Sequence, residues 1–283
     1  MAHVFATINL KGGVGKTTTT VALAETFSSE MGKRVLVIDL DPQTNATTML
    51  IGEERWESLN EKDHTLARLF KDALDGSTKK FDFDATLQTS VSNVSTARTV
   101  DLLPSSLDLI DVQDQLATIP SGRFYAVQPV ELLWKAVKSR LDNYDIVIVD
   151  CPPNLGIITL NGLRISQGFI IPTIPDILST YGIPQIVRRI KEFSDEIAEP
   201  IDPMGIVITK YQANSTLHQN TIRQLKSHSK LPPLFHTVIP QANQTAAAAE
   251  FGSKMTFKQK WGYNGLAENF RSLASEILVK LEG

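Results

Sequence analysis

Short apolar runs alternate with longer amphipathic stretches along most of the chain, a pattern typical of a sheet covered by helices. The run at residues 4–8 predicts a buried strand, and residues 19–31 predict the helix that follows it. Further strands are predicted at residues 34–38, 100–103, 146–150, 169–171, 205–208 and 237–239. Further helices are predicted at residues 107–116, 130–141, 155–166, 183–197, 217–229 and 265–281. The alternation predicts an α/β fold: a single doubly wound domain over residues 1–283, with a mostly parallel sheet and helices on both faces.

Residues 53–99 interrupt this alternation with a polar and irregular stretch. One amphipathic helix is predicted within it, because four apolar residues have helical spacing. These residues are Leu66, Leu69, Phe70 and Leu74. The sequence Asp75-Gly76-Ser77 then predicts a turn. We expect the stretch to be a surface excursion of the same domain rather than a second domain.

Between the first predicted strand and the first predicted helix lies a glycine-rich loop, Lys11-Gly12-Gly13-Val14-Gly15-Lys16-Thr17-Thr18. A strand, such a loop and a helix in this order form the context of a phosphate-binding loop, or P-loop. Glycines let backbone N–H groups point at phosphate oxygens, and the helix start adds its positive dipole end. Lys16 can reach the β- and γ-phosphates of a nucleotide, and the Thr17 hydroxyl can ligate magnesium. The alternative is a turn without a ligand, but two lysines among three glycines repel each other without an anion.

Acidic residues follow two of the predicted strands. Asp39 and Asp41 come after the second strand, and Asp150 ends an unbroken apolar run. Unbroken apolarity indicates a central parallel strand, and ligands bind beyond the carboxyl ends of such strands. We therefore expect Asp150 to lie near the P-loop and to hold a magnesium-bound water. For the first pair the alternative is a capping and turn cluster with Thr44 and Asn45.

Composition narrows the class of protein. Hydrophobic residues make up 42% of the chain and charged residues 21%, which fits an ordinary globular protein. The only cysteine, Cys151, rules out a disulfide framework within one chain and favours a cytoplasmic location. We expect Cys151 to be a buried small residue rather than a nucleophile. No apolar run approaches the roughly 18 residues of a membrane span, and the start lacks a signal-peptide pattern.

Basic residues gather between Asp202 and Glu268, where seven of them accompany one acidic residue, Glu250. Such a cluster is typical of phosphate-backbone binding, and without a recognition motif it predicts sequence-independent DNA binding. A solvated charged face is the alternative. The candidate DNA-binding residues, with two arginines upstream, are Arg188, Arg189, Arg223, Lys226, Lys230, Lys254, Lys258 and Lys260.

Four segments together resemble the ordered motifs of ParA/Soj-type partition ATPases, which belong to the ParA/MinD family. They are KGGVGKTTTTVALA, DLDPQTNAT, IVIVDCPPNLG and the VIPQ segment that contains Pro240. Leu10 stands where the common P-loop has its first glycine, and Lys11 is added, as in the deviant P-loop of this family. The resemblance covers nearly the whole chain. It implies an ATP-dependent homodimer with two nucleotides sandwiched between the subunits, and ATP and Mg²⁺ as cofactors.

The resemblance also implies roles for individual residues. Catalytic roles fall to Lys11, which crosses to the partner's nucleotide, to Lys16, and to Asp41, which orients the attacking water. Magnesium contacts fall to Thr17, Asp39 and Asp150, the last of these through water. Nucleotide contacts fall to Lys11, Gly12, Gly13, Val14, Gly15, Lys16, Thr17, Thr18, Lys210, Tyr211, Pro240 and Gln241.

Two segments depart from the family pattern around the expected base contacts. Lys210-Tyr211-Gln212 replaces a methionine-tyrosine-aspartate sequence, and Gln241-Ala242-Asn243 replaces a segment that often carries arginine.

The implied function is an ATPase that dimerises on ATP, binds nonspecific DNA of the nucleoid and leaves it on hydrolysis. A ParB-like or cargo-adaptor protein would stimulate hydrolysis, and the cargo would be a plasmid, a chromosome origin or a protein assembly. One alternative is a MinD-like membrane-cycling regulator, which the mixed charges of residues 265–281 disfavour. Another is a metabolic P-loop enzyme of the dethiobiotin-synthetase type, for which Lys11 has no evident use.

Overall fold

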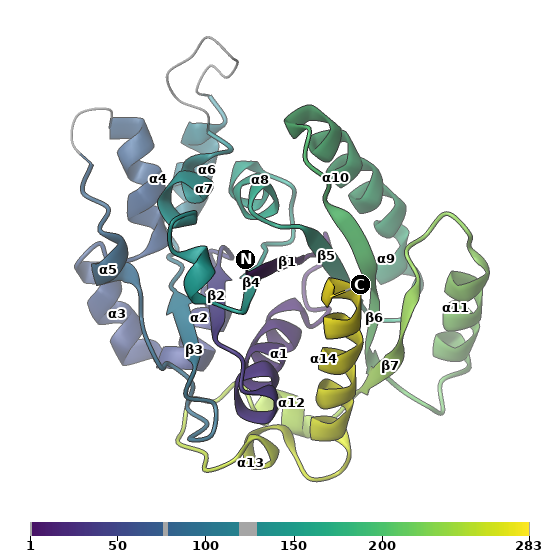
Figure 1. Cartoon of the computed structure of the whole chain (residues 1–283). Helices are drawn as coiled ribbons and strands as arrows, with labels where there is room; N and C mark the ends of the chain where they lie inside the picture. Colours follow the sequence, from purple (N-terminus) through teal and green to yellow (C-terminus); the bar gives the residue numbers. More distant parts are fainter. Residues whose placement is uncertain (1, 76–78, 119–128, 283) are drawn as a thin grey trace.

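A computed structural model describes residues 2–75, 79–118 and 129–282 of the 283-residue chain. Within these residues seven strands form one sheet in the order β3-β2-β4-β1-β5-β6-β7, and every neighbouring pair is parallel (Figure 1). The strands are β1 (His3–Thr7), β2 (Val35–Asp39), β3 (Val100–Leu103), β4 (Ile146–Asp150), β5 (Gly168–Thr173), β6 (Asp202–Tyr211) and β7 (Leu234–Pro240). All seven predicted strands are therefore confirmed, and the sheet is fully parallel.

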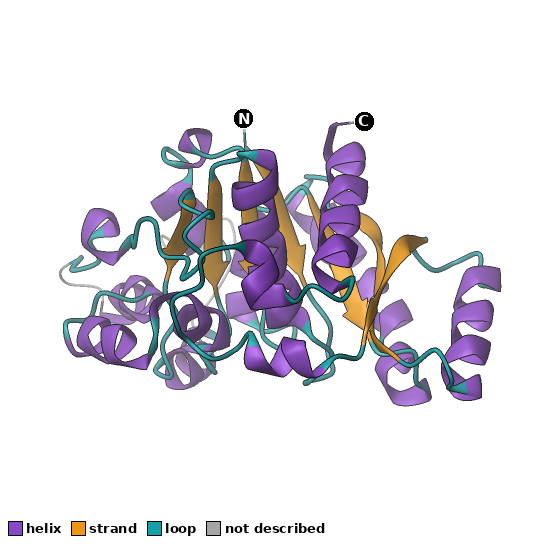
Figure 2. Ribbon diagram, turned by 90° about the horizontal axis from the view of Figure 1, so that it is seen from below, coloured by secondary structure: helices purple, strands orange, loops and turns teal. Residues whose placement is uncertain are grey.

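Helices cover both faces of the sheet, as the alternation predicted. On one face lie α1, α2, α13 and α14, and on the other lie α4, α6, α7, α8, α10 and α11. Figure 1 shows these two layers, and Figure 2 shows long helices in front of the strands, among them α14, which ends at the C mark. The first layer and its neighbours are α1 (Lys16–Met31), α2 (Asn45–Ile51), α3 (Glu53–Glu61), α12 (Asn243–Ala247), α13 (Phe257–Trp261) and α14 (Leu266–Glu282). The remaining helices are α4 (Leu66–Asp75), α5 (Phe83–Thr86), α6 (Leu109–Leu116), α7 (Leu132–Val137), α8 (Ile157–Arg164), α9 (Ile177–Tyr181), α10 (Ile183–Ile197), α11 (Thr216–Ser227) and the 3-10 turn η1 (Leu141–Asn143).

The central strands bring three polar side chains to one level of the sheet. In the parallel register, Asp150 of β4 pairs with Thr7 of β1 on one side and with Asp39 of β2 on the other. All residues of β2 and β4 are buried, which explains their unbroken apolar sequences. The P-loop follows β1 directly, so it leaves the sheet beside Asp150.

The sequence reasoning missed the short helices. Residues 53–86 contain α3 and α5 besides the predicted amphipathic helix α4. Helix α3 has no fully buried residue and rests on the core only through the partly buried Trp56 and Leu59, too few apolar positions to show a period. The turn predicted at residues 75–77 lies partly outside the described residues, and Asp75 itself ends α4. Thr44 occupies the N-cap position of α2 with a φ of 56°, but its side chain makes no capping hydrogen bond.

The last helix, α14, packs against β7 and α1 as a core element. Its buried residues include Leu266, Phe270, Leu273 and Ile277, which the periodicity placed on one face. Within the described ranges, no helix combines the length and apolarity needed to cross a membrane.

Gly205 in β6 generates a prediction about stability. Its φ is 156°, and a Cβ there would lie 2.8 Å from both a Phe235 ring carbon and the Pro233 carbonyl oxygen. Gly205→Ala is therefore expected to destabilise the fold by about 1–3 kcal/mol, measured by urea unfolding. Gly182→Ala is the control, because its Cβ would meet nothing closer than 3.9 Å. Equal unfolding midpoints for the two variants would contradict this account.

Candidate functional site

The P-loop connects β1 to α1 and is held in place from two sides. Gly13 and Gly15 have φ values of 74° and 87°, which other residues rarely adopt. From β6, Thr209 Oγ1 donates a hydrogen bond to the Val14 carbonyl at 2.7 Å, and Lys210 Nζ donates to the Gly13 carbonyl at 2.7 Å. Two loop carbonyls are thereby engaged by β6.

Asn9 braces the start of the same loop, and nothing in the sequence reasoning pointed to it. Its Oδ1 accepts a hydrogen bond from the Lys11 N–H at 3.0 Å, and its Nδ2 donates to the Pro172 carbonyl at 2.8 Å. The Asn9 side chain is buried, so it ties the loop to the carboxyl end of β5.

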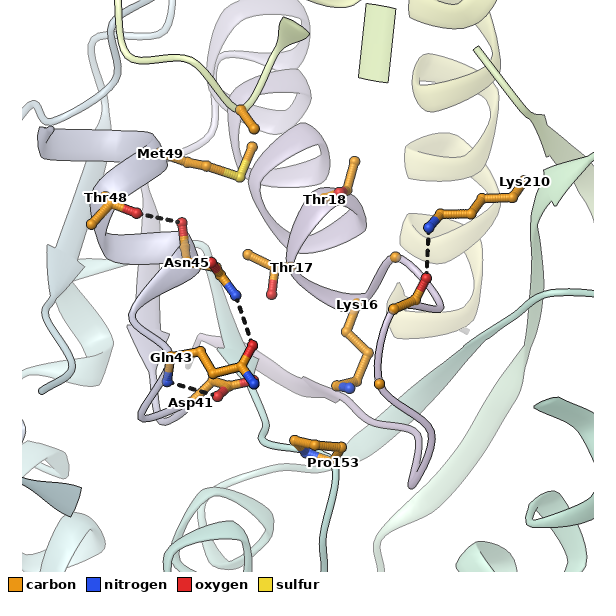
Figure 3. Close-up of a pocket in the computed structure, with 14 residues that line it drawn as sticks. Lys16, Thr17, Thr18, Asp41, Gln43, Asn45, Thr48, Met49, Pro153 and Lys210 are labelled. Carbon is orange, nitrogen blue, oxygen red and sulfur yellow. Dashed lines mark hydrogen bonds between the residues drawn. The ribbon is translucent and has the colours of Figure 1, made fainter. Parts of the chain in front are cut away.

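A cavity of about 360 Å³ opens above the P-loop (Figure 3). Its wall combines the P-loop, the segment after β2, helix α2 and single residues from elsewhere in the chain. The lining residues are Gly12, Gly13, Gly15, Lys16, Thr17, Thr18, Asp41, Gln43, Asn45, Thr48, Met49, Pro153, Lys210 and Ala249. Most of the predicted P-loop contacts therefore line one cavity, together with Asp41 and Lys210.

Four predicted or implied nucleotide residues do not line this cavity, besides Lys11, which is treated below. Val14 is fully buried and offers its backbone instead. Tyr211 and Pro240 pair at the ends of β6 and β7, and the Gln241 N–H donates to the Tyr211 carbonyl at 2.9 Å. The side chains of Gln212 and Gln241 are hydrogen-bonded to each other. These residues form a cluster beside Lys210, and Lys210 alone of them reaches the cavity wall.

Asp41 reaches the cavity from the segment after β2. Figure 3 shows Asp41 and Lys16 on opposite sides of the cavity, with both side chains directed into it. Asp41 Oδ1 accepts a hydrogen bond from the Gln43 N–H at 3.0 Å, which fixes the carboxylate. A carboxylate that lines the same cavity as a P-loop lysine can orient a water molecule for attack.

Asp39 lies behind the cavity wall. Its Oδ2 accepts hydrogen bonds from the Thr47 N–H at 2.9 Å and the Thr47 hydroxyl at 2.7 Å, and its Oδ1 accepts one from the Asp41 N–H. The side chain is fully buried. In this structure Asp39 therefore holds the loop that carries Asp41, rather than facing the cavity as a magnesium ligand.

Asp150 lies beneath the start of α1. It accepts hydrogen bonds from the Thr17 hydroxyl at 2.7 Å and the Thr20 hydroxyl at 3.1 Å. Among the described residues, no three Asp, Glu, His or Cys side chains are grouped as a metal-binding cluster. A hydroxyl and one carboxylate nonetheless suit Mg²⁺, which takes most of its ligands from phosphates and water.

Burial governs the ionisation of these groups. It raises the pKa of Asp150 to about 7, and it raises the pKa values of Asp39 and Asp41 as well. Burial also lowers the pKa of Lys16, against the pull of Asp150 and Asp41. Cys151 is fully buried, and burial raises the pKa of its thiol, which agrees with the expected structural role.

The prediction that Lys260 binds DNA is wrong. Lys260 is fully buried and its Nζ lies 2.8 Å from Glu25 Oε1, so it cannot reach a DNA phosphate. Lys258 pairs with Glu268 at 2.7 Å. Lys258 and the half-buried Lys254 lie around α13, on the opposite face of the sheet from α11. The basic stretch of the sequence therefore does not form one surface within a subunit.

Helix α11 and the residues just after it carry three exposed cations of the basic stretch. Arg223, Lys226 and Lys230 are exposed, and none of them forms a salt bridge with any described residue. Arg188 and Arg189 on α10 are exposed too, but both approach Glu192.

Six residues that line the cavity were not predicted from the sequence as ligand contacts. Gln43, Asn45 and Thr48 could have been inferred, because they lie within the segment that follows Asp41. The other three, Met49, Pro153 and Ala249, carry no polar signal in the sequence.

Comparisons with known proteins agree with this geometry. Residues 2–202 match a family model described as an AAA domain. The chain is 32% identical to an uncharacterized protein of Pseudomonas putida, over 98% of this chain and 95% of that protein. It is 29% identical to the chromosome-partitioning ATPase Soj of Thermus thermophilus, over 98% of this chain and 96% of that protein.

A solved structure is similar as well. Cobyrinic acid a,c-diamide synthase from Mycobacterium smegmatis, with bound ADP and magnesium, superposes with a TM-score of 0.74 at 26% identity. The match covers 100% of this chain and 96% of that one. Fold and site together define a P-loop ATPase. The chain belongs to the AAA domain family and, within it, to the ParA/Soj family of partition ATPases.

The buried carboxyls generate a prediction about pH. A carboxyl whose pKa is raised in the folded state gives the native protein extra protons, so stability decreases as pH rises from about 4 to about 7. The ligand-free protein should therefore have a lower urea midpoint at about pH 8 than at about pH 5. Asp150→Asn should reduce this difference, because one of the titrating groups is gone.

Asp145→Asn is the matched control for this measurement. Hydrogen bonds from Arg34 lower the pKa of the Asp145 carboxyl to about 2, below the tested window. The control should therefore keep the pH dependence of the parent protein. A midpoint that rises with pH in the parent would contradict the prediction.

Proposed function

We propose that the chain hydrolyses ATP in the cavity above the P-loop, dimerises while ATP is bound, and binds DNA without sequence preference. Hydrolysis, stimulated by a ParB-like or cargo-adaptor protein, would release the DNA. The observation that carries this proposal is the opposition of Asp41 and Lys16 across one cavity, with Lys11 outside it.

The cavity residues suit the triphosphate of ATP. Lys16 supplies positive charge for the β- and γ-phosphates, and the glycines leave the backbone of the loop accessible. Thr17 and Asp150 fit a Mg²⁺ site, and the ion would neutralise phosphate charge when bound. The Asp41 carboxylate, fixed by the Gln43 N–H, would orient the attacking water.

The position of Lys11 supports the proposal that the chain dimerises. It is half-buried, does not line the cavity of its own subunit, and makes no salt bridge among the described residues. A second nucleotide that approaches from outside the cavity would give this lysine phosphate charge to pair with. A second copy of the chain would bring that nucleotide and complete both sites.

The charges on helix α11 support the proposal that the chain binds DNA. Its exposed cations, Arg223 and Lys226, form no salt bridge within the described part of the chain, whereas the cations on α10 and α13 are paired with acidic residues. One subunit would contact few phosphates, and a dimer would double that number on one rigid surface. ATP-dependent dimerisation would thereby control attachment to the nucleoid, and would position a plasmid, a chromosome origin or a protein assembly.

The metabolic alternative retains one supporting observation. The similar structure from Mycobacterium smegmatis carries the name of a biosynthetic amide synthase. Such an enzyme would have no use for an ATP-dependent dimer or for nonspecific DNA binding. The two predictions below therefore separate the proposals.

The first concerns the dimer. Asp41→Ala should bind ATP and dimerise but hydrolyse poorly, because the carboxylate acts on the transition state more than on ground-state binding. Adding Lys11→Ala should abolish the dimer while ATP binding persists, since a charge-assisted contact across the interface is lost. Light scattering of both variants with ATP measures this. An unchanged dimer in the double variant would show that Lys11 does not act across the interface.

The second concerns DNA. With about four to six phosphates neutralised by a dimer, the log–log salt slope should be about −4 to −5. Arg223→Glu should weaken binding to all sequences alike and leave the ATP dimer intact. Fluorescence anisotropy on two unrelated duplexes, with ATP and with ADP, measures this.

Lys135→Glu is the matched control for charge reversal. Lys135 is exposed but pairs with Glu131 on α7, outside the candidate surface. It should leave DNA binding nearly unchanged. Equal binding with ADP and ATP, or a strong preference for one duplex, would defeat the DNA proposal.

A further inference from the structure

A charged pair is buried in the core beside α1, away from the nucleotide cavity. Lys260 Nζ lies 2.8 Å from Glu25 Oε1, and neither side chain is exposed. Glu25 also accepts hydrogen bonds from Ser92 Oγ at 2.7 Å and from Trp261 Nε1 at 2.6 Å. The carboxylate thus joins the P-loop helix to two segments that are distant in sequence.

A buried ion pair is not needed for stability alone. Removing two charges from water is costly, and well-packed apolar residues of similar size are often as stable. Charged hydrogen bonds instead demand a defined geometry, because each donor must meet its acceptor. The three donors around Glu25 therefore fix the positions of the two chain segments that carry Ser92 and Lys260–Trp261 relative to α1.

The pair fixes residues 248–256, the segment between α12 and α13. Lys260 Nζ also donates to Asn93 Oδ1 at 2.7 Å, and Asn93 Nδ2 donates to the Gly252 carbonyl at 2.9 Å. The Lys254 N–H donates to the Asn93 carbonyl at 2.8 Å. From Lys260 the contacts run through Asn93 to both Gly252 and Lys254.

The same segment forms part of the nucleotide cavity. Ala249 lines the cavity together with residues of α2. The Phe251 ring covers Gly52 at the end of α2, where a Cβ would lie 2.7 Å from the ring. Segment 248–256 therefore touches both the cavity and the helix that follows Asp41.

We propose that Glu25 and Lys260 are positioning residues for ATP binding. Their ion pair holds segment 248–256, and the segment sets the cavity wall through Ala249 and the contact of Phe251 with Gly52. This inference rests on the proposal that the cavity holds ATP. It gives Lys260 a role that its burial allows, in place of a DNA contact.

Phe251→Ala tests the wall without touching the core, because Phe251 is 53% exposed. The KM for ATP should rise about tenfold with kcat within about twofold, since the chemistry of Asp41 and Lys16 is untouched. Tyr263→Ala removes another exposed aromatic, at 67%, and should leave both constants unchanged. An unchanged KM in Phe251→Ala would overturn the inference.

Lys260→Met tests the pair itself. It should raise the KM for ATP at least as much as Phe251→Ala, and the double variant should add little, because both act through one segment. A purely structural role would instead lower stability and leave the KM unchanged. Additive effects of the two substitutions on KM would likewise contradict the shared segment.

Limited trypsin digestion gives a readout besides activity. In the parent protein Lys254 is half-buried and its backbone is hydrogen-bonded, so cleavage after it should be slow. Lys260→Met should accelerate that cleavage and leave cleavage after the exposed Lys226 unchanged. Equal rates after Lys254 in both proteins would overturn the inference, and this holds for any fraction of the variant that folds.

Lys16→Ala separates this inference from the proposed function. If Lys16→Ala loses ATP binding while Phe251→Ala and Lys260→Met keep the parent KM, the positioning role fails and the ATP site stands. If Lys16→Ala binds ATP as the parent does, the site assignment itself fails, and the inference fails with it.

Discussion

The nucleotide site depends on the carboxylate of Asp150, held in the core where three parallel strands end at one level. It accepts hydrogen bonds from Thr17 and Thr20, and so fixes the first turn of α1 over β4. The strand register places Asp39 beside it, and Asp39 in turn holds the loop of Asp41. The sheet, the P-loop and the loop that carries Asp41 are thereby positioned by two adjacent buried carboxyls, although burial raises the pKa of both.

Most of the fold could be predicted from the sequence, because the buried strands of a parallel sheet have nearly continuous apolar sequences. The central strands β2 and β4 follow that rule most closely, and the long helices show amphipathic spacing instead. The short helices do not. Helix α3 has no fully buried residue, and α9, α12 and α13 have five residues each, too few to show a period. Such elements form because their neighbours hold them, and a local pattern cannot reveal that.

The residues of the candidate site likewise fall into two groups: those within local sequence motifs, and those placed by the packing of distant segments. The P-loop and Asp41 lie within single contiguous motifs, so the sequence predicted them together. Ala249 and the buried Lys260 depend on where a distant segment packs, and charge counting misread Lys260 as a surface cation. Lys260 lies between Phe257 and Trp261, which are both buried. Without the packing of this segment, the sequence does not reveal that the lysine is buried with them. Net charge along a stretch does not say which face of the sheet each residue meets.

The place of β1 in the sheet has a consequence for synthesis on the ribosome. Strand β1 is flanked by β4 and β5, which end only at Asp150 and Thr173 and therefore emerge much later than β1. The side chains that hold the glycine-rich loop, Thr209 and Lys210, emerge later still. A nascent chain therefore exposes its whole P-loop long before the loop can take its shape. Nucleotide is therefore expected to stabilise only chains in which residues 209 and 210 have already emerged and packed against the loop.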